Sequence, residues 1–545
     1  IFGSIFFFFK YKRLNHFKEI LLITLIISIP LSIIGSLYGE QFYVFRGNIH
    51  DHFVYLSTGL SFNSYTHSEL ISFKENYPKN LSEEFYLKHV LALIYYRPSI
   101  QLFLGFLLNF KFIDVIQVSY LFKIIITILV SLGSVRFFLK LTNNIKSSFF
   151  LSLGFVFSFY YFYNYEIDAY SLIFSLPFLF LIFSYVIDLK DNLSQKNFIL
   201  FFKIGFVCAI YFIIYPNGAA IIFVPIFIYI LYLIKLSTNK KKYLINIIIS
   251  GIVFCIVMLP TYQSSLMYLL NSEIPIGLMH KNDFWGYYGA FIFGKDNPIH
   301  NMQIVKEIKE QWLINKSIVQ ILPSIIDINL KNNSLFLVNL IPSIFGFYHF
   351  SLSKNYDLLN YVLFVTLVFL NFIIVKRIYK NFISILKKDE NFNKFLIINF
   401  IFFIIFFLLL VANNLLWSSI KLYFILSPLI FILITLDISK SVPKFNKKYI
   451  LLLLIILPIY KYSEFNHGIG KLDSFPSIIK KESKTKFQWY INRIELEQCK
   501  TLKYDLSENL NKIYISLIYK TLKLNYNGVN CNIKIDNGKF KINKI

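Results

Sequence analysis

Charged residues are scarce in this sequence. Only 16% of its 545 residues are Asp, Glu, Lys or Arg, whereas a soluble domain carries about 25%. The charges that are present stand in clusters between long apolar runs, and 56% of the residues are hydrophobic. This distribution excludes an ordinary soluble domain and predicts a protein that crosses a membrane many times.

Acidic residues are the scarcer of the two charged kinds. The chain has 30 Asp and Glu against 55 Lys and Arg, which gives a net charge of +25. In a soluble protein this excess would suggest a nucleic-acid partner. Here the basic residues lie in short loops beside apolar segments, as in the cytoplasmic loops of membrane proteins. The partners expected are therefore membrane lipids, and nucleic acid is not expected.

Cysteine is also rare, with four in the chain. Cys208 and Cys255 fall within apolar runs, where cysteine acts as a small apolar residue. Cys499 and Cys531 lie in the polar C-terminal tail. They either form a disulfide in an oxidising outer compartment or remain two separate thiols.

Long apolar segments recur along the chain. A spanning helix needs about 20 mainly apolar residues. About eleven segments approach this length, so we expect an all-α polytopic membrane protein with about 11 transmembrane helices. The predicted spans are Ile20–Leu37, Val118–Leu139, Ser148–Phe162, Tyr170–Val186, Phe198–Tyr215, Ala219–Ile234, Leu244–Tyr262, Leu359–Val375, Phe395–Val411, Tyr423–Leu436 and Tyr449–Tyr460.

The basic loops predict the orientation of these spans. With the N-terminus in the cytoplasm, alternation places every short basic loop on the same, cytoplasmic side. Two further apolar segments would break this agreement if they crossed the membrane, so we expect them to be interfacial or buried parts of outer loops: Leu102–Phe112 and Leu335–Phe350.

Two domains are expected from this layout. Residues 1–460 form a transmembrane core with large outer loops at about 39–116 and 263–356. Residues 461–545 form a small C-terminal domain outside the membrane. Its short apolar runs alternate with polar turns, which is typical of a small soluble α+β domain.

Two outer segments carry acidic residues close to the predicted membrane surface. Asp51 follows the first span, in the segment Arg46–Leu60. Glu166 and Asp168 lie in the turn between the third and fourth spans. Such a carboxylate can act as a base, and the pair can bind a divalent cation or polarise a hydroxyl. A solvated loop aspartate, and acids that favour a helix N-terminus, are the simpler interpretations.

Two outer cations are candidates for binding phosphate. Lys421 stands at the outer end of the Tyr423–Leu436 span, followed by Tyr423. Arg97 precedes Pro98 and the apolar segment after it. A lysine at this depth can instead extend its side chain to the membrane surface without binding anything.

The order of these features resembles the GT-C superfamily of membrane glycosyltransferases. An acid follows the first span, an Arg-Pro precedes an interfacial segment, a second acid lies between the third and fourth spans, and a Lys-Leu-Tyr opens a late span. The bacterial members similar to aminoarabinose transferases and protein O-mannosyltransferases are the nearest in layout. The resemblance extends from about Ile20 to Tyr460. A Trp-Trp-Asp-Tyr-Gly signature is lacking, which argues against an oligosaccharyltransferase catalytic subunit.

The resemblance implies a role for each of these residues. Asp51 is the catalytic base, and Glu166 and Asp168 orient the acceptor or a cation. Metal binding by this pair is the one cofactor that the sequence suggests. Members of the family often have a second acid next to the catalytic one, whereas this chain has a histidine after Asp51. Many members also have an arginine late in the chain, where this chain has a lysine, which lacks the planar group that lets arginine bind two oxygens at once. The residues expected to bind substrate are His52, Tyr55, Arg97, Lys421 and Tyr423.

The activity implied is transfer of a hexosyl or pentosyl group, with inversion, from a polyprenyl-phosphate sugar donor. The acceptor is a hydroxyl of a lipid, a glycan or a protein. The expected location is the bacterial inner membrane with the site facing outward.

Three alternatives remain open. A transporter or flippase for lipid-linked sugars is favoured by Lys123 and Lys203, which lie inside predicted spans, although no internal repeat typical of transporters is visible. An envelope polysaccharide polymerase or ligase would share the lipid-linked substrate. A catalytically silent envelope scaffold would use the tail as a binding module.

Overall fold

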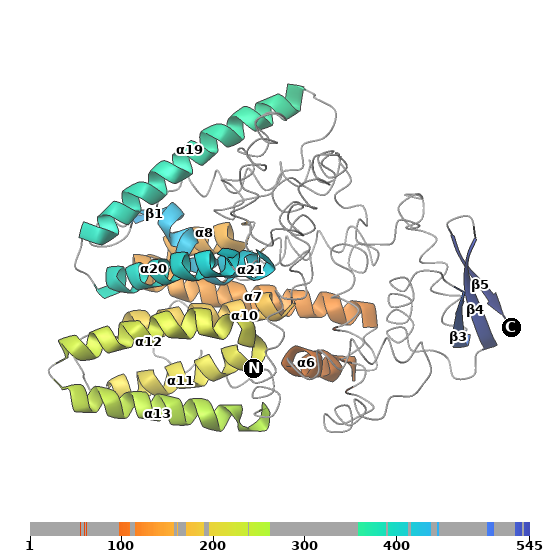
Figure 1. The fold of residues 1–545 in the computed structure, drawn as a ribbon, viewed down its shortest axis with the longest axis horizontal. Coiled ribbons are helices and arrows are strands. Elements are labelled where there is room, and N and C mark those ends of the chain that lie inside the picture. The colour runs from red at the N-terminus through yellow and green to blue at the C-terminus, as the bar shows by residue number, and fades with distance from the viewer. Residues whose placement is uncertain are drawn as a thin grey trace.

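Long α-helices dominate the structure, and most of them lie with their axes roughly along one direction (Figure 1). The structure is a computed structural model. It describes residues 98–109, 115–156, 170–189, 196–237, 239–261, 358–387, 391–412, 416–437, 444–445, 499–505, 529–536 and 539–544, together with positions 55, 59, 62, 158 and 161. These residues are almost entirely helical, as the sequence predicts.

The described helices fall into two groups along the chain, before residue 262 and after residue 357. The first group is α6 (Pro98–Leu108), α7 (Val115–Thr142), α8 (Ile145–Val156), α10 (Tyr170–Asp188) and α11 (Lys196–Ile214). A short 3-10 turn, η2 (Pro216–Gly218), leads to α12 (Ala219–Leu236) and α13 (Lys240–Met258), which ends in a second turn, η3 (Leu259–Thr261). The last group is α19 (Leu358–Lys387), α20 (Asn391–Ala412) and α21 (Leu416–Thr435).

Nine predicted spans, from Val118–Leu139 to Tyr423–Leu436, coincide with these helices. The spans Ile20–Leu37 and Tyr449–Tyr460, and the segment Leu335–Phe350, lie outside the described residues. Among the described residues, three helices are long and apolar enough to cross a membrane: Leu121–Thr142, Tyr170–Asp188 and Lys240–Thr261. They support a membrane location.

The turn between α7 and α8 shows how polar residues end one helix and begin the next. Asn143 has a φ of 50°, a left-handed conformation that asparagine tolerates better than most residues. The side chain of Asn144 then accepts a hydrogen bond from the backbone N–H of Ser147 at 3.0 Å. An asparagine at this position satisfies an N–H that the helix itself leaves unpaired.

Helix α10 lies at the centre of the bundle. Every residue from Tyr170 to Val186 is buried, and α10 packs against both α7 and α11. Pro177 stands inside it and faces Gly133 of α7, where a Cβ would lie 3.1 Å from the Pro177 carbonyl oxygen. The two helices can approach closely because α7 has no side chain at that point.

Helix α13 lies at the edge of the bundle. It packs closely on α11, and a Cβ at Gly205 of α11 would overlap the carbonyl group of Ser250. Its other face exposes apolar side chains at Leu244, Ile248 and Ile252. In water such a face would be unfavourable, whereas lipid chains would solvate it.

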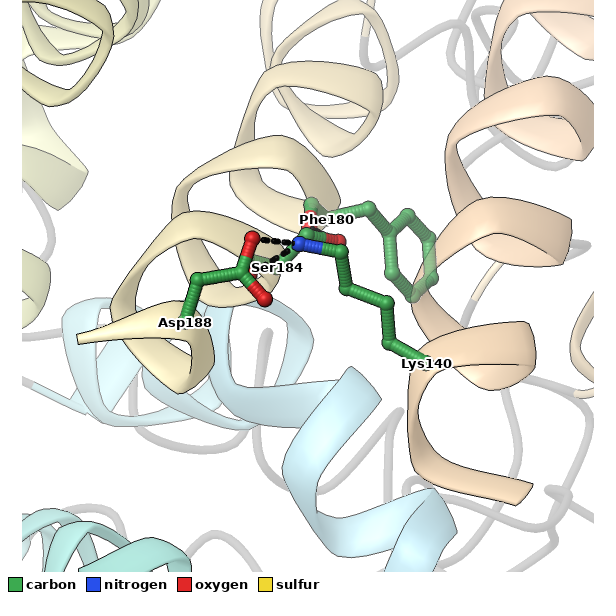
Figure 2. Close-up of polar contacts among 4 residues, drawn as sticks. All are labelled: Lys140, Phe180, Ser184 and Asp188. Carbon is green, nitrogen blue, oxygen red and sulfur yellow. Dashed lines mark hydrogen bonds and ion pairs between the residues drawn. The ribbon is translucent and has the colours of Figure 1, made fainter. Parts of the chain in front are cut away.

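Two ion pairs among the described residues join positions that the basic loops predict to be cytoplasmic. Lys140, near the end of α7, forms an ion pair with Asp188, the last residue of α10, and donates a hydrogen bond to the Ser184 carbonyl at 2.9 Å (Figure 2). Arg377 of α19 lies 3.6 Å from Asp437, which follows α21.

Helix α19 extends beyond its predicted span of Leu359–Val375 into the basic segment, as far as Lys387. The extension holds the buried Asn381, whose side-chain amide donates to the carbonyls of Leu433 at 2.5 Å and Leu436 at 2.7 Å. The prediction ended too early because hydropathy detects apolar residues, and this part of the helix is amphipathic.

The strands belong to two small sheets. After α21, β1 (Leu436–Asp437) pairs antiparallel with β2 (Lys444–Phe445). In the tail, β3 (Cys499–Asp505) pairs parallel with β4 (Val529–Asp536), and β4 pairs antiparallel with β5 (Lys539–Lys544). The predicted α+β domain at 461–545 stays a prediction, because most of its residues, including its boundary at residue 461, lie outside the described residues.

The register of β3 and β4 bears on the possible disulfide in the tail. Cys499 lies opposite Val529, two residues before Cys531. Cys531 therefore lies on the neighbouring strand and two residues further along, which places its Cα about 8 Å from that of Cys499. Disulfides usually join Cα atoms about 4.4–6.8 Å apart. This register therefore favours two separate thiols.

Candidate functional site

The structure describes only part of the predicted site. Tyr55 is described in full, and Lys421 and Tyr423 are described as backbone only, within the first two turns of α21. That helix begins at Leu416, seven residues before the predicted span. The remaining predicted residues lie outside the described part of the chain: Asp51, His52, Arg97, Glu166 and Asp168.

Tyr55 links the two acidic segments of the predicted site. Its side chain is buried, and its hydroxyl lies 2.8 Å from Oγ of Ser171, within hydrogen-bond distance. Its ring lies 5.3 Å from the ring of Tyr170, measured between centroids. Tyr55 comes four residues after Asp51, and Tyr170 comes two residues after Asp168. The chain segments next to the two predicted acids are therefore in contact.

A buried cation lies against the same aromatic pair. Lys123, in the first third of α7, is 5% exposed, and its Nζ stands 6.0 Å from the ring centroid of Tyr170. An ammonium in an apolar span is costly unless partners compensate for the lost water, and the face of an aromatic ring supplies one such partner. Lys123 thus belongs to the cluster that Tyr55 and Tyr170 form.

A second polar contact lies one turn further along α7. The hydroxyl of Thr127 lies 2.7 Å from that of Tyr161 and donates to the Lys123 carbonyl at 2.8 Å. Tyr161 is fully buried. These hydroxyls continue the polar character of the site along α7, one turn beyond Lys123.

Helix α6 closes one side of this region. It packs on α7 and α11, and Ser99 donates a hydrogen bond to the carbonyl of Ile213, near the end of α11, at 3.1 Å. Gly59 lies so close to α6 that a Cβ there would stand 3.1 Å from the N of Gly105. The position of α6 beside one end of α7 (Figure 1) agrees with the predicted interfacial or buried segment at Leu102–Phe112.

Gln101 of α6 is a buried amide beside Gly59. A Cβ at Gly59 would lie 3.2 Å from its backbone carbonyl oxygen. The Gln101 side chain is fully buried, and neither Nε2 nor Oε1 has a hydrogen-bond partner among the described residues. An amide offers both a donor and an acceptor, which is the pattern that sugar hydroxyls can satisfy.

A metal site is not defined by the described residues. The predicted ligands Glu166 and Asp168 lie outside them, and the described part of the chain contains no group of three or more His, Cys, Asp or Glu side chains suited to a metal ion. Metal binding by the acidic pair stays a prediction.

The sequence gives a weak signal for the residues that the structure adds. Lys123 is a single charge within an apolar run, and we noted it only as a feature typical of a transporter. Its distance to Tyr170 depends on how α7 packs against α10, which the pattern of apolar residues does not specify. Gln101 was missed because an amide in an interfacial helix has no distinctive spacing.

Comparison of the chain with models of protein families, with characterised proteins and with solved structures gave no match.

Proposed function

We propose that this chain is a membrane glycosyltransferase of GT-C-like layout. It moves a sugar from a polyprenyl-phosphate donor to a hydroxyl acceptor at the outer face of the membrane. The observation that carries the proposal is the contact of Tyr55 with Tyr170 and Ser171, beside the buried Lys123. This contact brings Tyr55, four residues after Asp51, onto the start of α10, two residues after Asp168.

The chemistry assigns a task to each kind of group. Transfer breaks the bond between the anomeric carbon and the phosphate oxygen, and the acceptor oxygen forms a new bond to that carbon. Asp51 removes the acceptor proton, and a cation stabilises the leaving phosphate. Lys123 supplies a positive charge next to the segment that follows Asp168, in addition to the outer cations Lys421 and Arg97. Glu166 and Asp168 orient the acceptor or a divalent cation.

The proposed topology has about eleven spans in the inner membrane of a bacterium, with the N-terminus in the cytoplasm. It is supported by the ion pairs Lys140–Asp188 and Arg377–Asp437, each of which joins ends that this topology places on one side. Two outer loops and the tail face the other side.

The test uses the full chain reconstituted in liposomes with a panel of radiolabelled polyprenyl-phosphate sugars and lipid or glycan acceptors. We expect labelled product from the native chain and none from Asp51→Asn, because the amide cannot accept the acceptor's proton. Asp188→Asn is the matched control, because it removes a carboxylate at the opposite end of α10. We expect this variant to keep its transferase activity. Normal turnover by Asp51→Asn would remove the proposed base.

A transporter for lipid-linked sugars is the second candidate, and one observation favours it. Lys123 is buried within a helix long enough to span the membrane, and buried charges in spans mark substrate pathways. The same liposomes distinguish the two functions. A transporter moves the labelled lipid to the opposite leaflet without cleaving it, whereas the transferase releases polyprenyl phosphate only when an acceptor is present.

A further inference from the structure

Three basic side chains converge on one tyrosine at the other end of the bundle from the candidate site. Arg136 and Lys140 come from α7, and Lys203 comes from α11. Their charged groups lie 5.4, 5.8 and 5.8 Å from the ring centroid of Tyr185 in α10. Cations at these distances from a ring face are attracted to it, so Tyr185 is the centre around which the group is arranged.

Asp188, at the end of α10, is an acid in contact with this group. It pairs with Lys140, which also bonds to the Ser184 carbonyl, as Figure 2 shows. Lys140 in turn interacts electrostatically with both Arg136 and Lys203. Like charges that the fold holds together repel one another, and an anion with several oxygens placed between them offsets that repulsion.

The surface next to Lys203 is suited to a hydrocarbon chain. Phe198, Phe202 and Phe206 of α11 are all exposed, and a spacing of four residues places them in one stripe along the helix. Lys203 stands between the levels of Phe202 and Phe206 on the same helix. A ligand with an anionic head and an apolar tail would meet both features at once.

Extension of single basic side chains towards the membrane surface would explain each cation alone. It does not explain why three of them, from two helices, meet around one ring while a stripe of exposed phenylalanines runs beside them. The combination is typical of basic pockets between helices that bind lipid headgroups on the cytoplasmic side.

We propose that Arg136, Lys140 and Lys203 bind the phosphate of an anionic phospholipid of the inner leaflet, with an acyl chain along the phenylalanine stripe of α11. This site is separate from the candidate transferase site and does not depend on the proposed activity, although its place in the inner leaflet rests on the proposed topology.

The experiment is native mass spectrometry of the full chain released from nanodiscs of phosphatidylcholine with a minor share of phosphatidylglycerol. We expect the native chain to retain phosphatidylglycerol in preference to phosphatidylcholine. Arg136→Gln and Lys203→Gln each reduce the retained fraction about fivefold, the change that corresponds to losing one basic residue at an anionic lipid surface. The charge-conserving variants Arg136→Lys and Lys203→Arg retain the lipid.

Two controls keep the result specific. Lys241→Gln removes an exposed charge at the start of α13, at the same predicted side but outside the group, and leaves retention unchanged. A second arm adds inorganic phosphate at millimolar concentration, which does not displace the lipid because it lacks the acyl chain. If size-exclusion chromatography shows that Arg136→Gln does not fold, the retention of phosphatidylglycerol by Lys203→Gln decides the result.

Three outcomes would overturn the proposal. Unchanged retention in Lys203→Gln shows that the group does not bind the phosphate. An equal loss in Lys241→Gln shows a general effect of charge. Displacement by inorganic phosphate shows that the ligand is a soluble phosphate and not a lipid.

Discussion

The hydroxyl of Tyr55 lies 2.8 Å from Oγ of Ser171, and 116 positions of the chain separate the two residues. One comes from the first predicted outer loop and the other from the first turn of α10. A buried hydrogen bond between such distant segments fixes how the outer loop lies on the helices. It is the contact on which the candidate site depends.

The Tyr55–Ser171 bond predicts coupling between the two side chains. We expect Tyr55→Phe and Ser171→Ala each to lower the free energy of unfolding by about 1 kcal/mol. The double variant should lose less than the sum, with a coupling of about 0.6 kcal/mol, which is typical of hydrogen bonds between membrane helices. Unfolding in mixed micelles with increasing SDS measures all three values. Strictly additive losses would contradict the bond.

Lys123 predicts a loss of catalysis that depends on charge. Lys123→Met removes the buried ammonium beside Tyr170 and is expected to lower kcat about 100-fold, as when one group stabilising the transition state is lost. Lys123→Arg keeps the charge and should keep part of the activity. Transfer assays in liposomes give kcat and KM for each. Equal loss in both variants would point to a structural role for the lysine.

The two predicted acids must lie near one reacting centre. We expect cysteines at positions 51 and 168 to be cross-linked by a reagent that spans about 15 Å, the largest separation compatible with one site whose contacts are about 3 Å. The background lacks the four native cysteines. Cysteines at 51 and 188 form the control pair, which lies at opposite predicted sides and should not react. Failure of the first pair to cross-link would remove the main support for catalysis.

The contact between α11 and α13 predicts opposite effects for two glycines. Gly205→Ala places a methyl group against the Ser250 carbonyl and should destabilise the protein by about 1–3 kcal/mol, the usual cost of overpacking. At Gly251 a Cβ meets nothing within 4 Å. Gly251→Ala should therefore stabilise α13 by up to about 1 kcal/mol, because alanine favours the helix. Thermal unfolding in detergent measures both, and equal effects would argue against this packing.

The ion pair at the ends of α7 and α10 predicts an asymmetric result. Asp188→Asn removes a half-exposed partner and should cost less than about 1 kcal/mol. Lys140→Met should cost more, because it also removes the bond to the Ser184 carbonyl. SDS unfolding distinguishes the two. A larger loss in Asp188→Asn than in Lys140→Met would show that the carbonyl bond contributes nothing.

Apolar runs predicted the helices well because the length of each run can be counted directly from the sequence. The prediction for α10 began at the observed Tyr170 and ended two residues early. The prediction was wrong at the end of α8, where a local backbone hydrogen bond forms instead of a further helical turn. The third predicted span continued to Phe162, whereas α8 ends at Val156, and the N–H of Ser158 bonds to the Phe155 carbonyl at 3.0 Å in a tighter turn. Hydropathy has no means of detecting such a turn.

The candidate site was less predictable than the helices. Tyr55 was expected from the sequence to bind substrate, which stays a prediction, whereas its hydrogen-bond contact with Ser171 was not foreseen. Lys123 lies beside Tyr170 because α7 packs against α10. These contacts form between elements that are distant in the chain, so the local pattern of residue types cannot predict them.

The bonds from Asn381 to the Leu433 and Leu436 carbonyls bear on the order in which the protein is made. The last carbonyls of a helix lack partners within it. The Leu433 carbonyl of α21 and the Leu436 carbonyl just after it accept from a residue synthesised 52 and 55 positions earlier. At about 5–20 residues per second, Asn381 leaves the ribosome roughly 3–10 seconds before Leu433. Helix α21 is therefore made when its partner residue is already present, and a permuted chain that made α21 first would leave those carbonyls without this donor until α19 was made.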